Sequence, residues 1–297
     1  TPFRLPADVA EPVRYQVDLT VVPDQDTFAG SSDIVVNFKK ATPILWLNAE
    51  KLQVKQASLS IGQETVAVKV VSTPKDYLLF EFDRPVGPGE ATLHVSYQGE
   101  ISRKDMQGIF QVKDEDRWYI YSQFENVGAR QAYPCFDEPG YKVPWQLTLH
   151  VRKDQAALSN APMISETEGS DGMKTVKFAE TKPLPSYLVA IAVGNFDFVE
   201  AGTTGKKNTQ VRIVTPHGRG AEAKFAAETT PTIVNLLEKY FGIPYPYEKL
   251  DEVAIPLAGY AMEHPGMVTY GASIIIAKPE ADTLERKREW VSVASHE

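Results

Sequence analysis

With 297 residues, the chain is long enough for two domains, because single hydrophobic cores rarely grow beyond about 250–300 residues. Its 43% hydrophobic and 24% charged residues are ordinary for a folded globular protein, and its net charge of −8 argues against a nucleic-acid partner. The single cysteine, Cys135, excludes an intramolecular disulfide and a cysteine-rich metal site.

The sequence carries no sign of a membrane span or of a targeting segment. It has no uninterrupted apolar run of about 18 residues and no basic leader before an apolar segment. The first residue is Thr1 rather than Met. We therefore expect a soluble protein that is either cytoplasmic, or periplasmic or secreted with a leader removed. Neither the compartment nor the oligomeric state follows from these features.

Up to about residue 200, apolar residues alternate with polar ones, which is the period of half-buried strands. The alternating sets are Val13, Tyr15, Val17, Leu19 and Val21; Ile34, Val36 and Phe38; Leu78, Phe80 and Phe82; Leu93, Val95 and Tyr97; and Trp145, Leu147, Leu149 and Val151. Short turns separate these segments and no long helical pattern interrupts them. We predict a mainly β domain over residues 1–200, an antiparallel sandwich or saddle-shaped sheet assembly.

Residues 201–297 change to helical spacing, and we predict an α+β region there. Apolar residues recur every three or four positions between Phe225 and Tyr240. Pro231 is expected to kink or divide this helix, and Gly242 to end it. A second helix is expected to begin near Asp282, an N-cap with a Glu three residues later in capping-box spacing.

The last two residues of that second helix are His296 and Glu297. In an HExxH motif, two histidines one helical turn apart bind one Zn²⁺, and the intervening Glu acts as general base on the metal-bound water. Only the first half of such a motif is present. Taken alone, a His–Glu pair is more often a surface histidine beside a solvated carboxylate.

A second segment, "QFENVGARQAYPCFDEPGYKVPW", spans residues 123–145 and joins a strand end to a proline-rich turn. For Asp137 and Glu138, the simplest interpretation is a loop in which carboxylates cap backbone N–H groups and pair with Arg130. Glu125 lies at the end of an alternating strand, and a functional role is more plausible for it.

A third segment, "PLAGYAMEHPGMVTYG", spans residues 256–271. Glu263 is flanked by Met262 and His264, which suits either a ligand-binding carboxylate or an edge-strand residue. His264 suits either a metal ligand or, more commonly, a hydrogen-bonded structural histidine.

Together these segments resemble the M1 family of zinc metallopeptidases, the aminopeptidase N-like gluzincins. "ARQAYPCFDEPGYKVPW" (residues 129–145) is similar to a long family signature, and "YAMEH" (260–264) stands where the family has GAMEN. His296-Glu297 stands at the start of the family's HExxH, which a further Glu ligand follows 19 residues after the second His. "YFGIPYPYEKLDEVAIP" (240–256) resembles the family's approach to GAMEN. The resemblance implies an N-terminal β domain over 1–200 and the incomplete start of a thermolysin-like peptidase domain over 201–297.

The resemblance also implies a metal and a catalytic role for the end of the chain. The full-length protein would hold one Zn²⁺, with His296 as its first ligand and Glu297 as general base and proton shuttle. Because catalytic zinc needs three protein ligands, the fragment itself is expected to be inactive, with zinc absent or weakly bound.

The substrates implied by the resemblance are peptides with a free N-terminus. Glu263 and Glu125 would bind the α-ammonium group through charge-assisted contacts, which orient the scissile bond toward the metal. Gln123, Ala261 and Met262 would line the first specificity pocket and the backbone clamp.

Two residues depart from the family pattern. Tyr260 replaces the glycine of GAMEN and His264 replaces its asparagine, changes that could narrow the pocket or shift the strand that pairs with substrate. Two alternatives stay open: a non-catalytic M1-like interaction scaffold, and an epoxide hydrolase/aminopeptidase of the leukotriene A4 hydrolase type. The second is less favoured because "FDEPGYK" and "AMEH" look closer to plain aminopeptidases.

Overall fold

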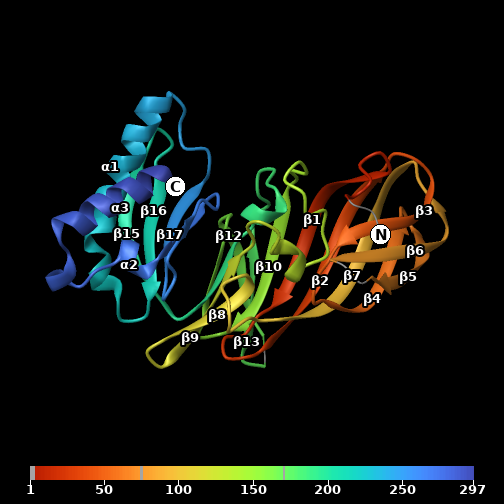
Figure 1. The fold of residues 1–297 in the computed structure, drawn as a ribbon, viewed down its shortest axis with the longest axis horizontal. Coiled ribbons are helices and arrows are strands. Elements are labelled where there is room, and N and C mark those ends of the chain that lie inside the picture. The colour runs from red at the N-terminus through yellow and green to blue at the C-terminus, as the bar shows by residue number, and fades with distance from the viewer. Residues whose placement is uncertain (1–3, 74–75, 170) are drawn as a thin grey trace. The chain divides into compact units, whose positions relative to one another are not determined.

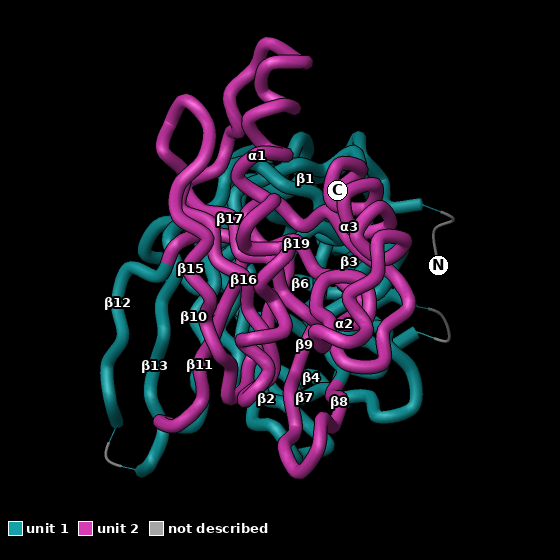
Figure 2. Tube along the Cα trace, turned by 90° about the vertical axis from the view of Figure 1, so that its left-hand side faces the viewer, with its two compact units in different colours: residues 1–110, 122–152, 163–189 teal, residues 111–121, 153–162, 190–297 magenta. Residues whose placement is uncertain are grey.

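The computed structural model describes residues 4–73, 76–169 and 171–297 (Figure 1). It divides into two compact units. Unit 1 comprises Thr1–Phe110, Ser122–Arg152 and Met163–Val189, and unit 2 comprises Gln111–Tyr121, Lys153–Pro162 and Ala190–Glu297 (Figure 2). The units follow spatial contacts rather than a single cut in the chain, so the domain boundary at residue 200 stays a prediction. Within the described residues, no helix combines the length and apolar character that a membrane crossing requires.

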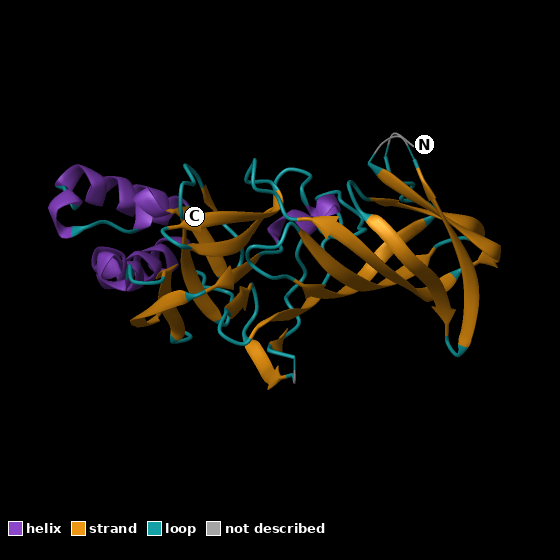
Figure 3. Cartoon of the chain, turned by 90° about the horizontal axis from the view of Figure 1, so that it is seen from below, coloured by secondary structure: helices purple, strands orange, loops and turns teal. Residues whose placement is uncertain are grey.

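Unit 1 is built on one ten-stranded sheet, with the strand order β12-β13-β10-β1-β2-β7-β4-β5-β6-β3 (strands orange in Figure 3). The strands are β1 (Ala10–Thr20), β2 (Thr27–Phe38), β3 (Thr42–Asn48), β4 (Gln53–Ile61), β5 (Glu64–Ser72), β6 (Tyr77–Val86), β7 (Gly89–Glu100), β10 (Trp145–Arg152), β12 (Met163–Glu168) and β13 (Met173–Phe178). The described pairings are antiparallel apart from β1 with β10, which is parallel with Tyr15 opposite Trp145. The mainly β class predicted for this region is confirmed.

The alternating apolar residues of unit 1 do form its core. The alternate positions from Trp145 to Val151 in β10 are all buried, and the Tyr15 ring stacks on Trp145 at 3.9 Å between centroids. Val13 is the exception, since it is only partly buried. A β-bulge between Pro12 and Arg14 shifts the register of β1, and such a shift moves the following side chains to the other face.

The segment 129–145 lies in unit 1 and begins with the short 3₁₀ helix η1 (Ala129–Gln131). The Asp137 carboxylate is buried, and it accepts hydrogen bonds from Arg130 Nε at 2.8 Å and from Ser186 Oγ at 2.6 Å. The backbone N–H of Leu5 donates to Glu138 at 3.1 Å. The loop interpretation of Asp137 and Glu138 is therefore confirmed, although the ion pair with Arg130 belongs to Asp137 alone.

Unit 2 contains most of a four-stranded sheet and all of a five-stranded mixed sheet. The first has the order β11-β14-β9-β8, formed by β8 (Gly108–Asp114), β9 (Arg117–Gln123), β11 (Ala156–Ser159) and β14 (Ile191–Gly194). The second has the order β15-β16-β17-β19-β18, formed by β15 (Phe196–Thr204), β16 (Thr209–Pro216), β17 (Lys249–Ile255), β18 (Ala261–Met262) and β19 (Met267–Gly271). β17 pairs in parallel with both β16 and β19, so it lies inside the sheet.

Helices of unit 2 pack against the five-stranded sheet and share one apolar core with it. They are α1 (Lys224–Phe241), α2 (Ala272–Ile275) and α3 (Leu284–His296), with short 3₁₀ turns η2 (Ser186–Leu188) in unit 1 and η3 (Gly220–Ala223) and η4 (Pro279–Ala281) in unit 2. Gly242 ends α1 with a positive φ of 72°, as predicted. Pro231 does not divide α1. Its missing N–H deprives the carbonyl four residues earlier of a backbone donor, while its own carbonyl accepts hydrogen bonds from the Asn235 side chain at 2.7 Å and from Thr204 Oγ1 at 2.8 Å.

Candidate active site

The hairpin of β18 and β19 presents one carboxylate from a buried turn. Met262 pairs with Thr269 across the hairpin, and Glu263 is the first residue of the turn that follows. Glu263 is exposed, whereas its neighbours Met262 and His264 are buried. Among the described residues, none forms a salt bridge with Glu263. The turn therefore offers a free carboxylate on a backbone anchored from both sides.

Side chains from neighbouring segments of unit 2 bind the backbone carbonyls in the rest of this turn. Asn160 Nδ2 donates to the carbonyl of Pro265 at 3.0 Å, and Lys249 Nζ donates to the carbonyl of Gly266 at 2.7 Å. Gly266 has a φ of +74°, and a Cβ at this position would collide with the Asn160 carbonyl. Only glycine fits both conditions, so the sequence itself fixes the shape of the turn.

His264 fills the space beneath the turn. Its side chain is 0% exposed, its Nδ1 lies 3.4 Å from Thr269 Oγ1, and its Nε2 has no hydrogen-bond partner within the described part of the chain. Burial lowers the pKa of this imidazole to about 3, because a charged ring would lose its hydration. His264 is therefore neutral at physiological pH, in agreement with the structural histidine favoured from sequence.

Helix α3 carries His296 as its last residue and begins one residue later than predicted. Its N-cap is Thr283, whose Oγ1 accepts a hydrogen bond from the N–H of Arg286 at 3.3 Å, and not Asp282. Asp282 instead forms an ion pair with the Arg286 guanidinium at 2.9 Å. Asp282 is thus used in an ion pair within the first turn, and Thr283 provides the cap instead.

Packing fixes α3 within unit 2. The Trp290 ring is fully buried and meets the Tyr270 ring edge-on at 5.2 Å between centroids. Its Nε1 donates to Thr229 Oγ1 of α1 at 2.9 Å. At the end of the helix His296 is exposed and Glu297 is half-buried. One aromatic anchor thus connects the helix that carries His296 with strand β19.

Gln123 and Glu125 belong to unit 1, at and beyond the end of β9. Gln107 Nε2 donates to both of their carbonyls, at 3.0 Å and 2.9 Å, and so holds the backbone of this corner. Glu125 is exposed and forms no salt bridge in the described residues, and Gln123 Oε1 is buried without a hydrogen-bond partner there. Like Glu263, Glu125 offers a carboxylate that forms no ion pair within the part of the chain that the structure describes.

Comparison with known proteins decides the family. Residues 11–188 match the model of the peptidase M1 N-terminal domain, and residues 225–297 match that of the peptidase family M1 domain. The chain belongs to peptidase family M1. It is 36% identical to aminopeptidase M1-A of Oryza sativa subsp. japonica and 34% identical to the puromycin-sensitive aminopeptidase of Caenorhabditis elegans, in each case over 99% of this chain. It is 28% identical to glutamyl aminopeptidase of Bos taurus, again over 99% of its length. The aligned part is 34%, 32% and 32% of those three relatives, so the chain spans about a third of their length.

This M1 chain departs from the family's GAMEN motif at Tyr260, which leads into the hairpin. The Tyr260 carbonyl accepts a hydrogen bond from the N–H of Gly271 at 2.7 Å, a contact that any residue could make. Its hydroxyl is buried and has no hydrogen-bond partner in the described residues. The narrowing of the first specificity pocket by this side chain stays a prediction.

The described residues of the M1 chain do not by themselves form a zinc site. None of their His, Cys, Asp and Glu side chains gather in a group of three that could hold a metal ion. Catalytic zinc is bound by three protein ligands and keeps one open position. His296 supplies at most one of these ligands, and the predicted roles of the site residues in both units stay predictions.

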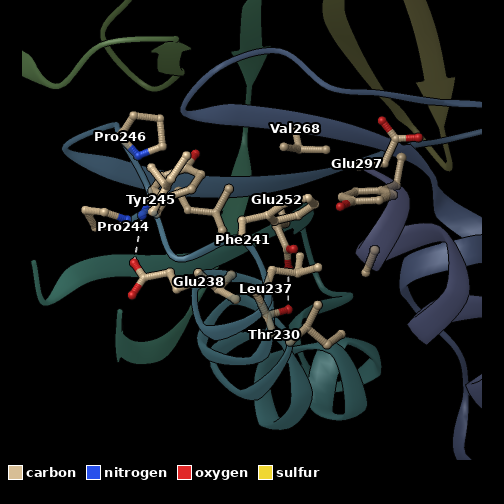
Figure 4. Close-up of a pocket in the computed structure, with 16 residues that line it drawn as sticks. Thr230, Leu237, Glu238, Phe241, Pro244, Tyr245, Pro246, Glu252, Val268 and Glu297 are labelled. Atoms are coloured by element: carbon tan, nitrogen blue, oxygen red, sulfur yellow. Dashed lines mark hydrogen bonds between the residues drawn. The ribbon is translucent and has the colours of Figure 1, made fainter. Parts of the chain in front are cut away.

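An apolar pocket of about 320 Å³ lies elsewhere in unit 2, between α1, the loop after it and the five-stranded sheet (Figure 4). Leu237, Phe241 and Val268 contribute to its apolar wall, and Glu297 lies at its edge. Its lining does not include Glu263. The pocket therefore shares strand β19 and Glu297 with the candidate site, although Glu263 is not part of its lining.

Sequence reasoning missed a buried acid in this pocket, Glu252 of β17. Glu252 is 3% exposed and accepts hydrogen bonds from Thr230 Oγ1 at 2.7 Å and from the Tyr270 hydroxyl, and no described cation pairs with it. Burial raises the pKa of Glu252 to about 8. The signal in the sequence was the position of "LDEVAI" between two loops, since a strand inside a parallel sheet is buried on both faces.

The adjacent Asp251 shows the opposite behaviour on the opposite face of the strand. Burial alone would raise the pKa of Asp251, but the charges of Lys249 and Arg212 outweigh it and lower that pKa. Arg212 binds the carboxylate through two hydrogen bonds, of 2.7 Å and 2.9 Å. Neighbouring carboxyl groups thus differ in pKa because only one of them faces cations.

Proposed function

We propose that this chain is the N-terminal part of a zinc-dependent aminopeptidase that releases N-terminal residues from peptides. The observation that carries the proposal is the exposed, unpaired carboxylate of Glu263, held on a rigid turn of an M1 chain. A carboxylate that is not neutralised internally suits a cationic ligand, and the α-ammonium of a peptide is such a ligand. The names of the relatives, all aminopeptidases, support the same reaction.

In this proposal Glu263 of unit 2 recognises the ammonium group, and Ala261 and Met262 of the same hairpin line the first specificity pocket and hold the substrate backbone. The roles that the family resemblance implies for Glu125 and Gln123 of unit 1 stay predictions. Fixing the ammonium places the first peptide bond at a set distance along the chain, so recognition of the N-terminus also selects the bond to be cleaved. The removal of single residues, rather than internal cleavage, follows from that geometry.

His296 and Glu297 complete the proposal at the end of α3. His296 would be one zinc ligand, and Glu297 would hold and move the proton of the attacking water. Zinc, when bound, supplies Lewis-acid chemistry at the carbonyl and lowers the pKa of a bound water. Because the described residues offer one of three required ligands, the chain by itself is expected to be inactive and to bind zinc weakly.

The test uses the full-length protein with aminoacyl-arylamide substrates. Glu297→Gln removes the proposed base without changing side-chain volume, and kcat should fall by about 10²–10⁴-fold, the usual contribution of a general base. Glu285→Gln is the matched control, since Glu285 is an exposed residue near the start of the same helix. Full activity in the Glu297→Gln variant would contradict the assignment of Glu297 as the general base.

Metal content separates the proposal from a non-catalytic scaffold. We expect the purified full-length protein to contain about one zinc per chain by elemental analysis, and to lose arylamide hydrolysis when a chelator removes it. A full-length protein that neither holds zinc nor hydrolyses any arylamide would instead be an interaction module.

A further inference from the structure

We propose that Glu252 is a positioning residue for the peptidase reaction, which as a neutral buried acid holds helix α3 in place and, by losing its proton, sets an alkaline limit to activity. This inference rests on the proposed function, because it assumes that His296 and Glu297 act at the end of α3. Glu252 acts through its neighbours, since it lies buried in β17 among the residues that line the apolar pocket (Figure 4).

Glu252 belongs to a closed ring of contacts that joins two helices and two strands of unit 2. Thr230 of α1 is hydrogen-bonded to Glu252 Oε2 at 2.7 Å, and the Tyr270 hydroxyl of β19 bonds to the same carboxyl group. The Tyr270 ring packs against Trp290 of α3 at 5.2 Å between centroids. Trp290 Nε1 donates to Thr229 of α1 at 2.9 Å, which closes the ring. The contacts of the acid therefore lead to the helix that ends at the candidate active site.

The hydrogen bonds around Thr230 favour a protonated Glu252. Thr230 Oγ1 lies 2.7 Å from Glu252 Oε2 and 2.9 Å from the carbonyl of Ala226. A hydroxyl has one proton to donate and a carbonyl can only accept, so a second proton is needed for both contacts to be hydrogen bonds. A neutral carboxyl group supplies that proton. Burial, which raises the pKa of Glu252 to about 8, favours the same state.

The groups that face Glu252 offer no positive charge. The titratable side chains that line the pocket with it come from α1, the loop after α1, β19 and the end of α3: Glu238, Tyr245, Tyr270 and Glu297. Within the described residues, the lining includes no basic side chain. On β17 itself, Lys249 and Asp251 lie on the opposite face and pair with each other.

The charge states of the pocket leave Glu252 as the group that changes near pH 8. Burial raises the pKa of both Tyr245 and Tyr270, so these hydroxyls stay neutral. A hydrogen bond from the backbone N–H of Tyr245 lowers the pKa of Glu238, so this carboxylate stays charged. A proton lost from Glu252 would add a second negative charge to an apolar pocket that has no cation to pair with it.

Ionisation of Glu252 should open the ring of contacts. An unpaired charge in an apolar pocket is unfavourable, and the strain is relieved when water enters or when the surrounding elements move apart. Either change loosens Tyr270, against which Trp290 packs, and so alters where α3 ends. Because a general base must lie within hydrogen-bond reach of its water, a small displacement of α3 should lower catalysis.

The test compares the pH dependence of wild type and Glu252→Gln in the full-length protein. We would measure kcat/KM for an aminoacyl-arylamide between pH 6 and pH 9.5 and divide the value of the variant by that of wild type at each pH. Groups that titrate in both proteins, including the substrate amine, cancel in this ratio. With a pKa of about 8, about one wild-type molecule in ten keeps the Glu252 proton at pH 9. The ratio should therefore rise about tenfold from pH 7 to pH 9.

Two further variants examine the same titration. Thr230→Val keeps a similar shape and removes the hydroxyl, whose hydrogen bond lowers the pKa of Glu252. In this variant the alkaline decline should move to higher pH, which keeps the inference testable if Glu252→Gln does not fold. The matched control is Glu238→Gln, at an ionised carboxylate of the same pocket. Its ratio to wild type should be equal at pH 7 and pH 9, because Glu238 is charged at both.

A second readout separates this inference from the proposed function. Amide hydrogen exchange in α3, corrected for the intrinsic effect of pH, should increase in wild type between pH 7 and pH 9 and stay constant in Glu252→Gln. A merely structural role would act through the folded fraction, so each kcat/KM is divided by the fraction folded from circular dichroism. An activity ratio that then stays flat would overturn the inference. If the full-length protein hydrolyses no arylamide at any pH, the proposed function fails, and exchange in α3 alone decides whether Glu252 holds the helix.

Discussion

Two segments of this chain resemble M1 signatures, and their polar groups are used in opposite ways. In the segment 129–145 of unit 1, the Asp137 carboxylate is buried and bound by Arg130 and Ser186. In the turn 260–266 of unit 2, the Glu263 carboxylate is exposed and no described cation pairs with it. The carboxylate of the longer segment, 129–145, stabilises the fold, whereas the carboxylate of the shorter segment, 260–266, is available to a ligand.

The presence or absence of an internal ion-pair partner separates structural carboxylates from those that could bind a ligand. A buried ion pair removes two charges from water and each partner then depends on the other. An exposed carboxylate on a rigid turn depends on no internal partner and stays available to a ligand. Substitution of the paired Asp137 is therefore expected to lower the stability of the fold strongly. Substitution of Glu263 is expected to weaken ligand binding alone.

The largest expected effect is the loss of stability on substitution of Asp137. Asp137→Ala removes the 2.8 Å partner of the Arg130 guanidinium, whose side chain is 11% exposed, and leaves it only the longer contact of 3.4 Å with the exposed Asp76. The loss should destabilise unit 1 by about 3 kcal/mol. Glu263→Ala should change the free energy of unfolding by less than about 0.5 kcal/mol, as exposed substitutions usually do. Urea unfolding measures both, and hydrogen exchange in β1 and β10 shows that unit 1 is affected. Equal losses in the two variants would contradict the distinction.

Glu252 is a third kind of carboxyl group, a buried acid that pairs with no cation among the described residues, and its effect should depend on pH. Since burial raises its pKa from 4.5 to about 8, the folded state keeps a proton that the unfolded chain releases. The stability linked to Glu252 is therefore complete below about pH 4.5 and is lost as the pH rises toward 8. Glu252→Gln keeps the acceptor for Thr230 and removes this loss, so the variant should gain on the order of 3 kcal/mol relative to wild type between pH 5 and pH 8.

The measurement for Glu252 is urea unfolding of both proteins at several pH values across that range. The control is Asp251→Asn on the same strand, which removes a carboxylate paired with Arg212 and Lys249 and should destabilise the protein. A difference between wild type and Glu252→Gln that does not change with pH would show that the carboxyl group does not hold its proton in the folded state.

Much of the fold could be predicted from the sequence because it depends on local patterns. The period of two predicted the strands of unit 1, and the left-handed Gly242 ended α1 where expected. Long-range pairing could not be predicted in this way. The parallel pairing of β1 with β10 joins residues about 130 positions apart, and nothing in the alternation of either strand specifies its neighbour.

Smaller errors have local physical causes. Val13 fits the alternation of β1, but the bulge beside it changes which face it occupies. Pro231 costs one backbone hydrogen bond, which the packing of α1 in the apolar core of unit 2 offsets. The composition of the loop predicted the pairing of Asp137 with Arg130, and the role of Glu263, taken from the motif order, stays a prediction. Glu252 was missed because an acid inside a strand looks like a solvent-facing residue until the sheet is known to be covered on both faces.

The smallest expected effect concerns the start of α3 and separates a cap from a charge. Thr283→Ala removes the hydroxyl that accepts from the Arg286 N–H, so it should destabilise the helix start by about 1 kcal/mol. Asp282→Ala removes a partly exposed i,i+4 ion pair and should cost less than about 0.5 kcal/mol. Amide hydrogen exchange in the first turn of α3 distinguishes them, since only the threonine variant should expose the Arg286 amide. A larger effect of Asp282→Ala would contradict this and support Asp282 as the N-cap, as predicted from the sequence. In either case Trp290, in the middle of α3, keeps its contacts with Thr229 and Tyr270. Exchange beyond it, toward His296, should not change, because the position of the helix depends on this packing rather than on how the helix begins.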